Sequence, residues 1–413
     1  MKTSRGVVWL LGLGAFGLAF SITTTAAYLP PLLEEFTDSN TMIAAVLAAE
    51  GVFALTLPLV IGPWSDTFKT PMGRRRPFML AALGPMGFCL AILAFMPNIW
   101  TMTLIVLAFF FAYYVYEPPY RGLYPDVLHE SLYGRSQGVQ HVLRGIALGI
   151  ALVAGGFLFK VWHPAPFLLA AVATTAACGA VVLWIREPEG EGSRVFRGVR
   201  SYVKTSWTVF FGVPEVRRFL FANAAWEGTF AAMRTFVVLY ITIGLGEPLS
   251  TSSAVLATVA VGYVIAALGS PRLGEHFGLA RVILGASIVY GAGLLASGLA
   301  QEWHNWYYGL ILPVAVAGGT VMTLSWALLF KLMPAQHRGA IAGLATTTKG
   351  LGLLIGPLVA GIMIDVTKPY LSSTDGYAAL WPVCAIPVLA AIPLVASLIP
   401  HESASGSAEP QPS

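Results

Sequence analysis

Twelve long apolar stretches, separated by short polar segments, run along the chain. A helix needs about 20 residues to cross a bilayer, and each stretch is close to that length or longer. The first is too long for the apolar core of a signal peptide, so it is predicted to be a span. The pattern predicts an all-α polytopic membrane protein with twelve transmembrane helices, at 7–33, 42–63, 78–96, 99–120, 136–160, 164–185, 217–243, 252–270, 280–300, 306–331, 339–364 and 377–399.

The basic residues orient these spans. If the N-terminus is cytoplasmic, 19 of the 24 Lys and Arg residues fall on the inner side, and only Lys160 and Lys368 fall outside. The other three, Arg144, Arg234 and Lys349, lie within spans. Because short cytoplasmic loops of membrane proteins are enriched in positive charge, this split predicts an even number of spans with both termini in the cytoplasm.

Composition excludes several classes of protein. The 413 residues are 56% hydrophobic and 11% charged, whereas soluble domains have about 25% charged residues, so no soluble catalytic domain is expected. The dispersed net charge of +4 predicts no nucleic-acid surface. The three cysteines lie apart in apolar runs, so no metal or cofactor is expected. Without an ATP-binding motif or a clustered catalytic site, neither an ATP-driven pump nor an enzyme is predicted.

The two halves of the chain carry a related pattern. Gly138 lies six residues before Arg144-Gly145, and Gly343 lies six residues before Lys349-Gly350, at an offset of 205 residues. Secondary transporters use such repeats for alternating access. We expect two pseudo-symmetric six-helix halves, at 1–186 and 215–400. The linker between them, 187–214, is either an amphipathic helix or a solvated segment, and residues 401–413 are expected to form a disordered tail.

The loop after the second span contains a family motif. The segment from Gly62-Pro63-Trp64-Ser65-Asp66 to Gly73-Arg74-Arg75-Arg76-Pro77-Phe78 resembles the loop 2–3 motif of the major facilitator superfamily. The resemblance implies the major facilitator fold and a conformational latch at this loop. The latch residues we expect, including neighbouring charged groups, are Gly62, Asp66, Gly73, Arg74, Arg121, Asp126 and Glu50.

A finer resemblance concerns residues 28–126. The Ser-Asp pair, the Gly-Arg-Arg-Arg-Pro-Phe run, Tyr28-Leu29-Pro30 and Pro119-Tyr120-Arg121 are similar to the sucrose–proton symporter-like and glycoside cation-symporter branch. Thr67 replaces a basic residue found in many members, and Arg144 and Lys349 are not general features of the sugar-transporting members.

Charged side chains inside spans cost several kcal/mol unless they are paired or hydrated. In span seven, Asn223, Glu227 and Arg234 share one helical face, and the family geometry places that span at the central cavity. Glu227 is predicted to carry a proton, and the alternative is a structural salt bridge with Arg234 or Arg144. The full substrate and proton pathway is predicted to comprise Glu227, Asn223, Arg234, Glu117, Arg144, Lys349, Tyr28 and Tyr120.

Two further pairings are predicted. Glu117 and Arg121 are four residues apart on one helix and can pair, while Arg121 can also reach Asp66. By family geometry, Glu50 and Lys349 face each other across the two halves and can form a pair that breaks as the halves rock.

The sequence therefore favours a proton-coupled secondary transporter of a small polar solute, a sugar or glycoside symporter. The alternatives are a proton-driven drug or metabolite exporter and an organic-anion transporter. Na+ is the alternative coupling ion. We expect a multi-pass monomer in lipid, in the plasma membrane and specifically the bacterial inner membrane.

Overall fold

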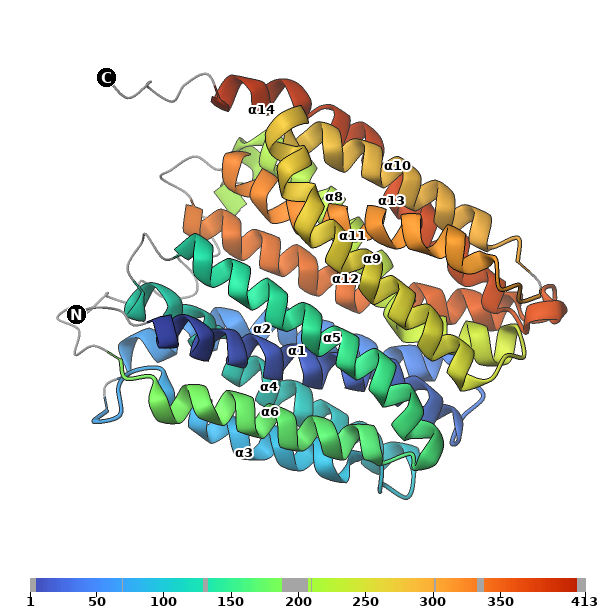
Figure 1. The fold of residues 1–413 in the computed structure, drawn as a ribbon, viewed down its shortest axis with the longest axis horizontal. Coiled ribbons are helices and arrows are strands. Elements are labelled where there is room, and N and C mark those ends of the chain that lie inside the picture. The colour runs from blue at the N-terminus through green and yellow to red at the C-terminus, as the bar shows by residue number, and fades with distance from the viewer. Residues whose placement is uncertain are drawn as a thin grey trace. The chain divides into compact units, whose positions relative to one another are not determined.

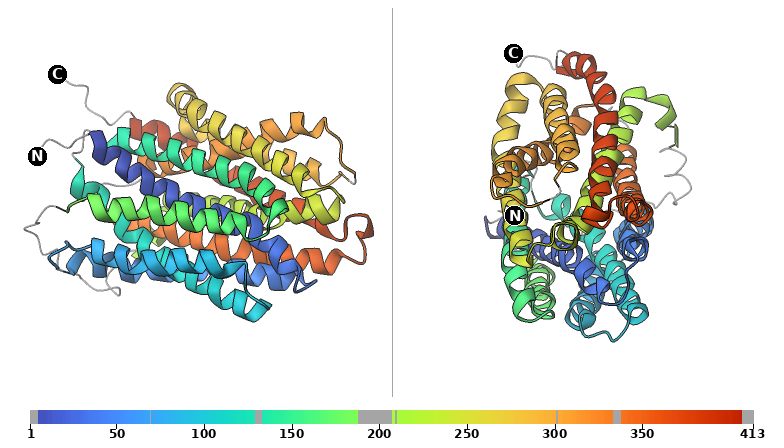
Figure 2. Two further views of the ribbon diagram at one scale, coloured as in Figure 1. Left: turned by 60° about the horizontal axis from the view of Figure 1, so that its bottom comes forward. Right: turned by 90° about the vertical axis from the view of Figure 1, so that its right-hand side faces the viewer.

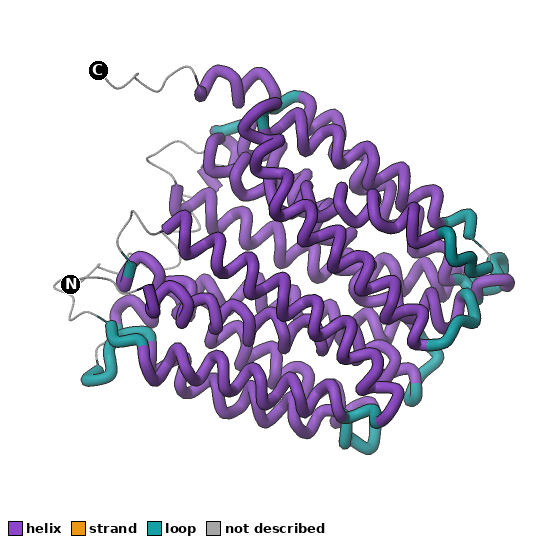
Figure 3. The backbone as a smooth tube through the Cα atoms, in the orientation of Figure 1, coloured by secondary structure: helices purple, strands orange, loops and turns teal. Residues whose placement is uncertain are grey.

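The computed structural model describes residues 5–68, 70–128, 133–187, 207–208, 210–300, 302–332 and 338–406. Helices connected by short loops make up the described chain (Figure 3). Eleven of the described helices are long and apolar enough to cross a membrane. The α-helix α8, which spans Pro214–Leu239, is the twelfth long helix and carries the polar residues of span seven. The prediction of an all-α membrane protein is confirmed.

The chain divides into two compact units. The first comprises Met1–Arg197 with Ser252–Ala257, and the second comprises Gly198–Thr251 with Thr258–Ser413. The helices of the first unit are α1 (Arg5–Glu34), α2 (Asn40–Thr67), α3 (Arg76–Leu93), α4 (Ile99–Val127), α5 (Tyr133–Val161) and α6 (Ala165–Trp184).

The rest of the chain forms a second set of helices. Residues Tyr240–Gly244 continue α8 as a short π-helical turn, η2, and two 3-10 turns precede α13. These helices are α8, α9 (Leu249–Phe277), α10 (Leu279–Ser297), α11 (Tyr307–Leu332), α12 (Arg338–Thr367), η4 (Ser372–Thr374), η5 (Tyr377–Ala379), α13 (Leu380–Ala396) and α14 (Ile399–Gly406).

Both sets of helices repeat one packing scheme. In the first unit α1 packs against α5 and α6, and α3 packs against α4 and α6 (Figure 1, Figure 2). In the second, α8 packs against α12 and α13, and α10 packs against α11 and α13. Each of these four contacts thus has a counterpart six spans later, as the repeat in the sequence predicted.

Local polar residues begin several helices. Ser39 caps α2 by accepting a hydrogen bond from the Met42 amide, and Asn98 caps α4 by accepting from the Trp100 and Thr101 amides. Pro214 occupies the first turn of α8, where the missing N–H costs no helical hydrogen bond. These caps place the helix starts within a few residues of the predicted spans.

Two predicted segments have different outcomes. The disordered tail was expected to start at 401, whereas α14 extends to Gly406, because the side chain of Glu402 binds another helix. The rest of the tail lies outside the described residues. So does most of the predicted amphipathic linker, of which 188–206 and 209 are not described.

Candidate functional site

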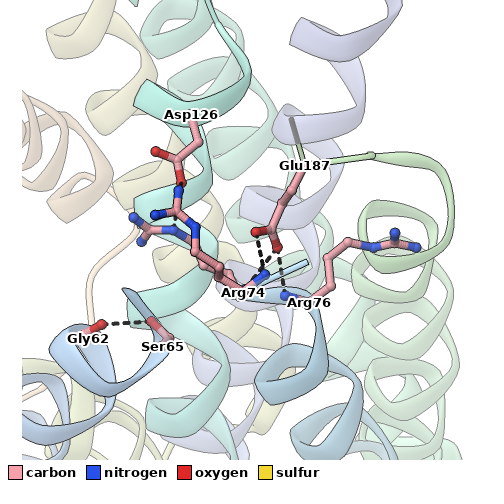
Figure 4. A network of polar contacts seen from close by, with 7 residues as sticks. Gly62, Ser65, Arg74, Arg76, Asp126 and Glu187 are labelled. Atoms are coloured by element: carbon pink, nitrogen blue, oxygen red, sulfur yellow. Dashed lines mark hydrogen bonds and ion pairs between the residues drawn. The ribbon is translucent and has the colours of Figure 1, made fainter. Parts of the chain in front are cut away.

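A carboxylate caps α3 at the predicted latch (Figure 4). The side chain of Glu187, which follows α6, accepts hydrogen bonds from the backbone amides of Arg74, Arg75 and Arg76, at 2.7, 2.9 and 2.9 Å. The first amides of a helix lack intrahelical partners and carry a partial positive charge. Glu187 therefore ties the end of α6 to the start of α3.

Asp126 forms the second part of this network. Its carboxylate binds the Arg75 Nε atom at 2.9 Å and the Arg74 Nη2 atom at 3.3 Å, which links the end of α4 to the α2–α3 loop. Gly122 leaves the space for this contact, because a Cβ atom there would overlap the Arg75 guanidinium. Asp126 and Arg74, both assigned to the latch, thus bind each other, and the latch role itself stays a prediction.

The glycines of the loop differ in what they do. Gly73 has φ +106°, and a Cβ there would also crowd the Glu187 carboxylate. At Gly62, a Cβ atom would meet no described residue beyond its own helix turn and chain neighbours within 4 Å, and the Gly62 carbonyl accepts from the Ser65 hydroxyl at 2.7 Å. Asp66 lies in the last turn of α2, and its side chain is outside the described part of the chain.

Arg121 pairs with Glu117 through its Nη2 and Nε atoms, at 2.6 and 2.8 Å from the Glu117 Oε1 atom. The Glu117 side chain is 12% exposed and that of Arg121 is 52% exposed. This is the first of the two arrangements predicted for Arg121.

The second unit contains a matching cap. Glu402 of α14 accepts from the backbone amides of Leu279 and Ala280 at the start of α10, both at 2.8 Å, and its Oε1 atom lies 3.2 Å from the Lys331 Nζ atom. Burial raises the pKa of this carboxyl, but the two amides and the Lys331 ammonium outweigh it, so the pKa is lowered.

Sequence reasoning missed both caps. Neither Glu187 nor Glu402 belongs to a predicted site, and Glu402 was assigned to a disordered tail. The signal that could have found them is positional: each is an acid that closely follows the last span of its half, at residues 187 and 402. An acid at that point lies at the same end of the bundle as the start of the third span of that half.

Asn223 on α8 is bound to α12. Its Nδ2 atom donates to the Thr348 hydroxyl at 3.1 Å and to the Ala345 carbonyl at 3.4 Å. The side chains of Asn223 and Glu227 are buried, with Glu227 6% exposed, and Arg234 is partly exposed. The polar face predicted for span seven therefore includes a direct contact with the helix that carries Lys349.

Glycines bring α8 and α12 close together beside Glu227. A Cβ atom added at Gly352 would lie 2.7 Å from the Gly228 nitrogen and 2.9 Å from the Glu227 Cβ atom, and one at Gly356 would overlap the Gly228 carbonyl. Small residues allow helix backbones to approach in membranes. The position of Glu227 is therefore fixed by backbone packing as well as by side chains.

In the first unit, Glu50 on α2 is 4% exposed. One of its carboxylate oxygens accepts from the Tyr114 hydroxyl of α4 at 3.2 Å. The pair predicted between Glu50 and Lys349 would join the two units, and it stays a prediction.

Two tyrosines of the predicted pathway bond to backbone carbonyls instead. The Tyr28 hydroxyl donates to the Leu152 carbonyl at 2.8 Å, and its ring stacks on Phe159. The Tyr120 hydroxyl bonds to the Leu11 carbonyl. In this structure both side chains serve packing against neighbouring helices.

Arg144 and Lys349 are partly exposed. Within its own unit, neither forms an ion pair or hydrogen bond with another described residue. Among the described residues, no group of three or more His, Cys, Asp or Glu side chains could hold a metal ion.

Comparison with solved structures shows the fold. A mutant form of the nucleoside transporter NupG matches with a TM-score of 0.73 and 14% identity, covering 95% of this chain and 98% of that one. A bacterial homolog of the human lysosomal transporter Spinster, inward-facing and occupied, matches with a TM-score of 0.74 and 13% identity over 100% of both chains.

Curated relatives match over shorter stretches. An uncharacterised MFS-type transporter of Mycobacterium tuberculosis is 28% identical over 125 residues, which is 30% of this chain and 18% of that protein. Multidrug resistance protein 3 of Bacillus subtilis is 28% identical over 116 residues, 26% of this chain and 22% of that protein. None of these four names describes a sugar transporter, so the sucrose-symporter branch stays a prediction.

The family model of the Major Facilitator Superfamily matches residues 11–357 and 236–411. This match extends over nearly the whole chain. The chain therefore belongs to the Major Facilitator Superfamily, and it is a multi-pass membrane transporter.

Proposed function

We propose that this transporter couples the movement of a small polar solute to protons by alternating access, and that the solute is a sugar or glycoside. One observation carries the coupling: Glu227 is only 6% exposed within a long helix of the membrane bundle. A buried carboxyl in a membrane helix is costly when charged. A change in the burial of Glu227 can therefore favour either the uptake or the release of its proton.

The surroundings of Glu227 support this role. Asn223, one turn earlier on the same face, is bound to Thr348, and the glycine contact of α8 with α12 lies beside the Cβ atom of Glu227. A movement of α8 against α12 would change the environment of Glu227. Proton binding and helix movement are thereby coupled, which alternating access requires.

Support for a sugar comes from the motif resemblance and from aromatic residues. Tyr113, Tyr116 and Tyr120 share one side of α4, and Tyr116 stacks on Tyr120 at a ring distance of 6.1 Å. Tyrosine rings offer flat apolar faces with polar edges, which suit the two sides of a sugar ring. All three are buried, but Tyr113 is 8% exposed against 0% for Tyr116 and 2% for Tyr120, so Tyr113 is the member we expect to contact the solute.

A second candidate is a proton-driven exporter of drugs or metabolites. It is favoured by the relative from Bacillus subtilis, which is named as a multidrug resistance protein. The Glu227 carboxyl would then bind and release the protons that enter in exchange for the exported solute. In either case we expect a monomer in the bacterial inner membrane with both termini in the cytoplasm, and Na+ is the alternative to the proton.

The test is uptake by proteoliposomes under an imposed pH gradient, with labelled glucosides, disaccharides and dyes. We expect wild type to accumulate a sugar, and Glu227→Gln to lose accumulation while retaining counterflow, because exchange needs no net proton movement. Glu275→Gln, an exposed acid on α9, is the matched control and should behave as wild type. Accumulation that survives in Glu227→Gln would remove the coupling role, and gradient-driven dye expulsion without sugar uptake would select the exporter.

A further inference from the structure

The C-terminal helix α14 meets the ends of three other helices of the second unit. Glu402 caps the start of α10 and lies 3.2 Å from the Lys331 Nζ atom of α11. The preceding residue, His401, contacts a third helix, because its Nε2 atom lies 3.1 Å from the Glu215 Oε1 atom of α8. All four residues belong to the second unit. The helix α14 therefore connects the start of α8 to α10 and α11.

Both ring nitrogens of His401 lie next to hydrogen-bond acceptors. The Nδ1 atom is 3.2 Å from the Ser397 carbonyl oxygen, and the Nε2 atom is 3.1 Å from the Glu215 carboxylate. A carbonyl oxygen and an ionised carboxylate can only accept hydrogen bonds. A neutral imidazole carries one N–H, whereas the protonated ring carries two. Since only the protonated ring can donate to both acceptors, the geometry selects the charged form of His401.

The His–Glu pair of the first unit lacks this arrangement. The His163 Nδ1 atom lies 3.0 Å from the Glu35 Oε1 atom, and the ring stacks on Phe159. Among the described residues, none accepts a hydrogen bond from the His163 Nε2 atom. A neutral ring with its hydrogen on Nδ1 satisfies this contact. The requirement for a bound proton therefore distinguishes His401 from His163.

His401 is the group at this contact that we expect to titrate near neutral pH. Histidine is the side chain whose charge ordinarily changes between pH 5 and 8, and the His401 side chain is 42% exposed, so protons from solution reach it. The other charged side chains on the elements that meet this end of α14 are Glu215, Arg217 and Arg218 of α8, Arg281 of α10, Lys331 of α11 and Glu402 of α14 itself.

The two contacts of α14 differ in their dependence on this proton. The helix has eight residues, Ile399–Gly406, and a helix this short is marginal without tertiary contacts. Glu402, which is 7% exposed, holds α14 on α10 and α11 in either charge state of His401. The contact between His401 and Glu215 becomes an ion pair when the ring is protonated. The link to α8 is thus the part that responds to pH.

We propose that His401 is a proton-binding site separate from Glu227, and that the bound proton fastens α14 to α8. The distribution of basic residues assigns this end of the bundle to the cytoplasm. Glu215 and Glu227 lie twelve residues apart on one continuous helix, so a link at Glu215 restrains the helix that carries Glu227.

The consequence is that cytoplasmic protons slow the transporter. This step rests on the proposed function, in which α8 moves against α12 during the cycle, because a link from α8 to α10 and α11 opposes that movement. In a symporter, the protons that enter with the solute would then limit further uptake. The site reads the proton concentration of the compartment into which the coupling proton is released.

Hydrogen exchange tests the proton-dependent link without any solute. The exchange of backbone amides in α14 is measured in lipid nanodiscs at about pH 6 and about pH 8. His401→Gln retains a side chain that can donate to Glu215 but cannot be protonated. Comparing this variant with wild type at the same pH removes the chemical effect of pH on exchange. We expect α14 to exchange about fivefold faster in the variant at the lower pH, the effect of losing a partly exposed ion pair, and equally fast at the higher pH.

Two further variants test the assignment. Glu215→Gln removes the charged partner and keeps His401, so it should give the same acceleration at the lower pH. His163→Gln changes the His–Glu pair of the first unit and should leave α14 as in wild type at both pH values. The proposal is overturned if α14 exchanges as in wild type in both His401→Gln and Glu215→Gln at the lower pH, or if the acceleration is equal at both pH values. If His401→Gln is not recovered as a folded protein, Glu215→Gln decides.

Counterflow with the same pH on both sides of the proteoliposome membrane tests the effect on transport. The probe is the labelled glucoside, disaccharide or dye that wild type moves in the uptake test. We expect His401→Gln to exchange this probe about threefold faster than wild type at about pH 6 and equally fast at about pH 8. A variant that is no faster than wild type at the lower pH overturns the slowing by cytoplasmic protons.

Failure of this inference and failure of the proposed function give different results. If wild type moves none of the probes, or if accumulation survives in Glu227→Gln, the proposed function fails and the slowing of α8 fails with it. The exchange of α14 amides still decides whether a proton at His401 fastens α14 to α8. If accumulation is lost in Glu227→Gln while α14 exchange is independent of His401, proton coupling stands and the second proton site is overturned.

Discussion

In each unit a glutamate carboxylate caps the start of the third helix, but the residues around the two carboxylates differ. In the first unit Glu187 accepts three backbone amides at the start of α3, and in the second Glu402 accepts two at the start of α10. Around Glu187 the helix start carries arginines that also hold Asp126. Around Glu402 a single ammonium, that of Lys331, completes the site.

This difference separates the carboxylate cap, which both units share, from the guanidinium–carboxylate network, which occurs at the first cap. The carboxylate cap is present in both units because the exposed amides at the start of each third helix need an acceptor. The guanidinium–carboxylate network occurs at the first cap, where the family motif lies. We therefore expect the first cap to be more important for stability and for the latch than the second.

The largest expected effect is on the first cap. Glu187→Gln replaces one carboxylate oxygen with an amide nitrogen that cannot accept from the amides of Arg74–Arg76. We expect it to destabilise the purified protein by about 2 kcal/mol, and Glu402→Gln by about half as much because fewer amides are affected. Thermal unfolding in detergent compares them, with Glu275→Gln as the exposed control. Equal losses in the two Gln variants would contradict the ranking.

Most of the fold was predictable from the sequence, because long apolar stretches mark the spans and the basic residues between them favour an even number. The one weak case was α8, which does not meet the apolar criterion because Asn223, Glu227 and Arg234 lie in it. The span was nevertheless placed at 217–243 as an apolar stretch, close to Pro214–Leu239, and the distribution of basic residues then supported an even number of spans. The helix that is hardest to recognise by hydropathy is therefore the one that carries the candidate site.

The candidate site was less predictable, because a sequence shows which residues are polar but not which partners they have. Asp126 and Arg74 were expected in the latch and bind each other. Tyr28 was expected in the solute pathway, which stays a prediction, and its hydroxyl bonds to the Leu152 carbonyl. Such contacts depend on the rotation of each helix, which an apolar stretch with polar residues on several faces does not determine.

A second comparison concerns the glycines next to the two caps. Gly73 has φ +106° and Gly278 has φ +90°, so alanine is strained at both. A Cβ at Gly73 would lie 2.7 Å from the Glu187 carboxyl carbon, whereas one at Gly278 would lie 3.4 Å from the nearest Glu402 oxygen. We expect Gly73→Ala to cost about 1–2 kcal/mol and Gly278→Ala less. Apparent melting temperatures measure this, and a larger loss at Gly278 would show that crowding of the cap is not the cause.

The smallest effect should appear in the pH dependence of the second cap. Burial raises the pKa of Glu402, but the α10 amides and Lys331 lower it below the ordinary value of 4.5. A carboxyl whose pKa is lowered in the folded protein stabilises it above the unfolded pKa, and this contribution is lost as the pH falls through the folded pKa. The difference in melting temperature between wild type and Glu402→Gln should therefore be constant from pH 7 to about 5.5 and shrink below about 4.5. A difference that already shrinks between pH 7 and 6 would mean that the Glu402 carboxyl takes up its proton well above its ordinary pKa, and that burial outweighs the amides of α10.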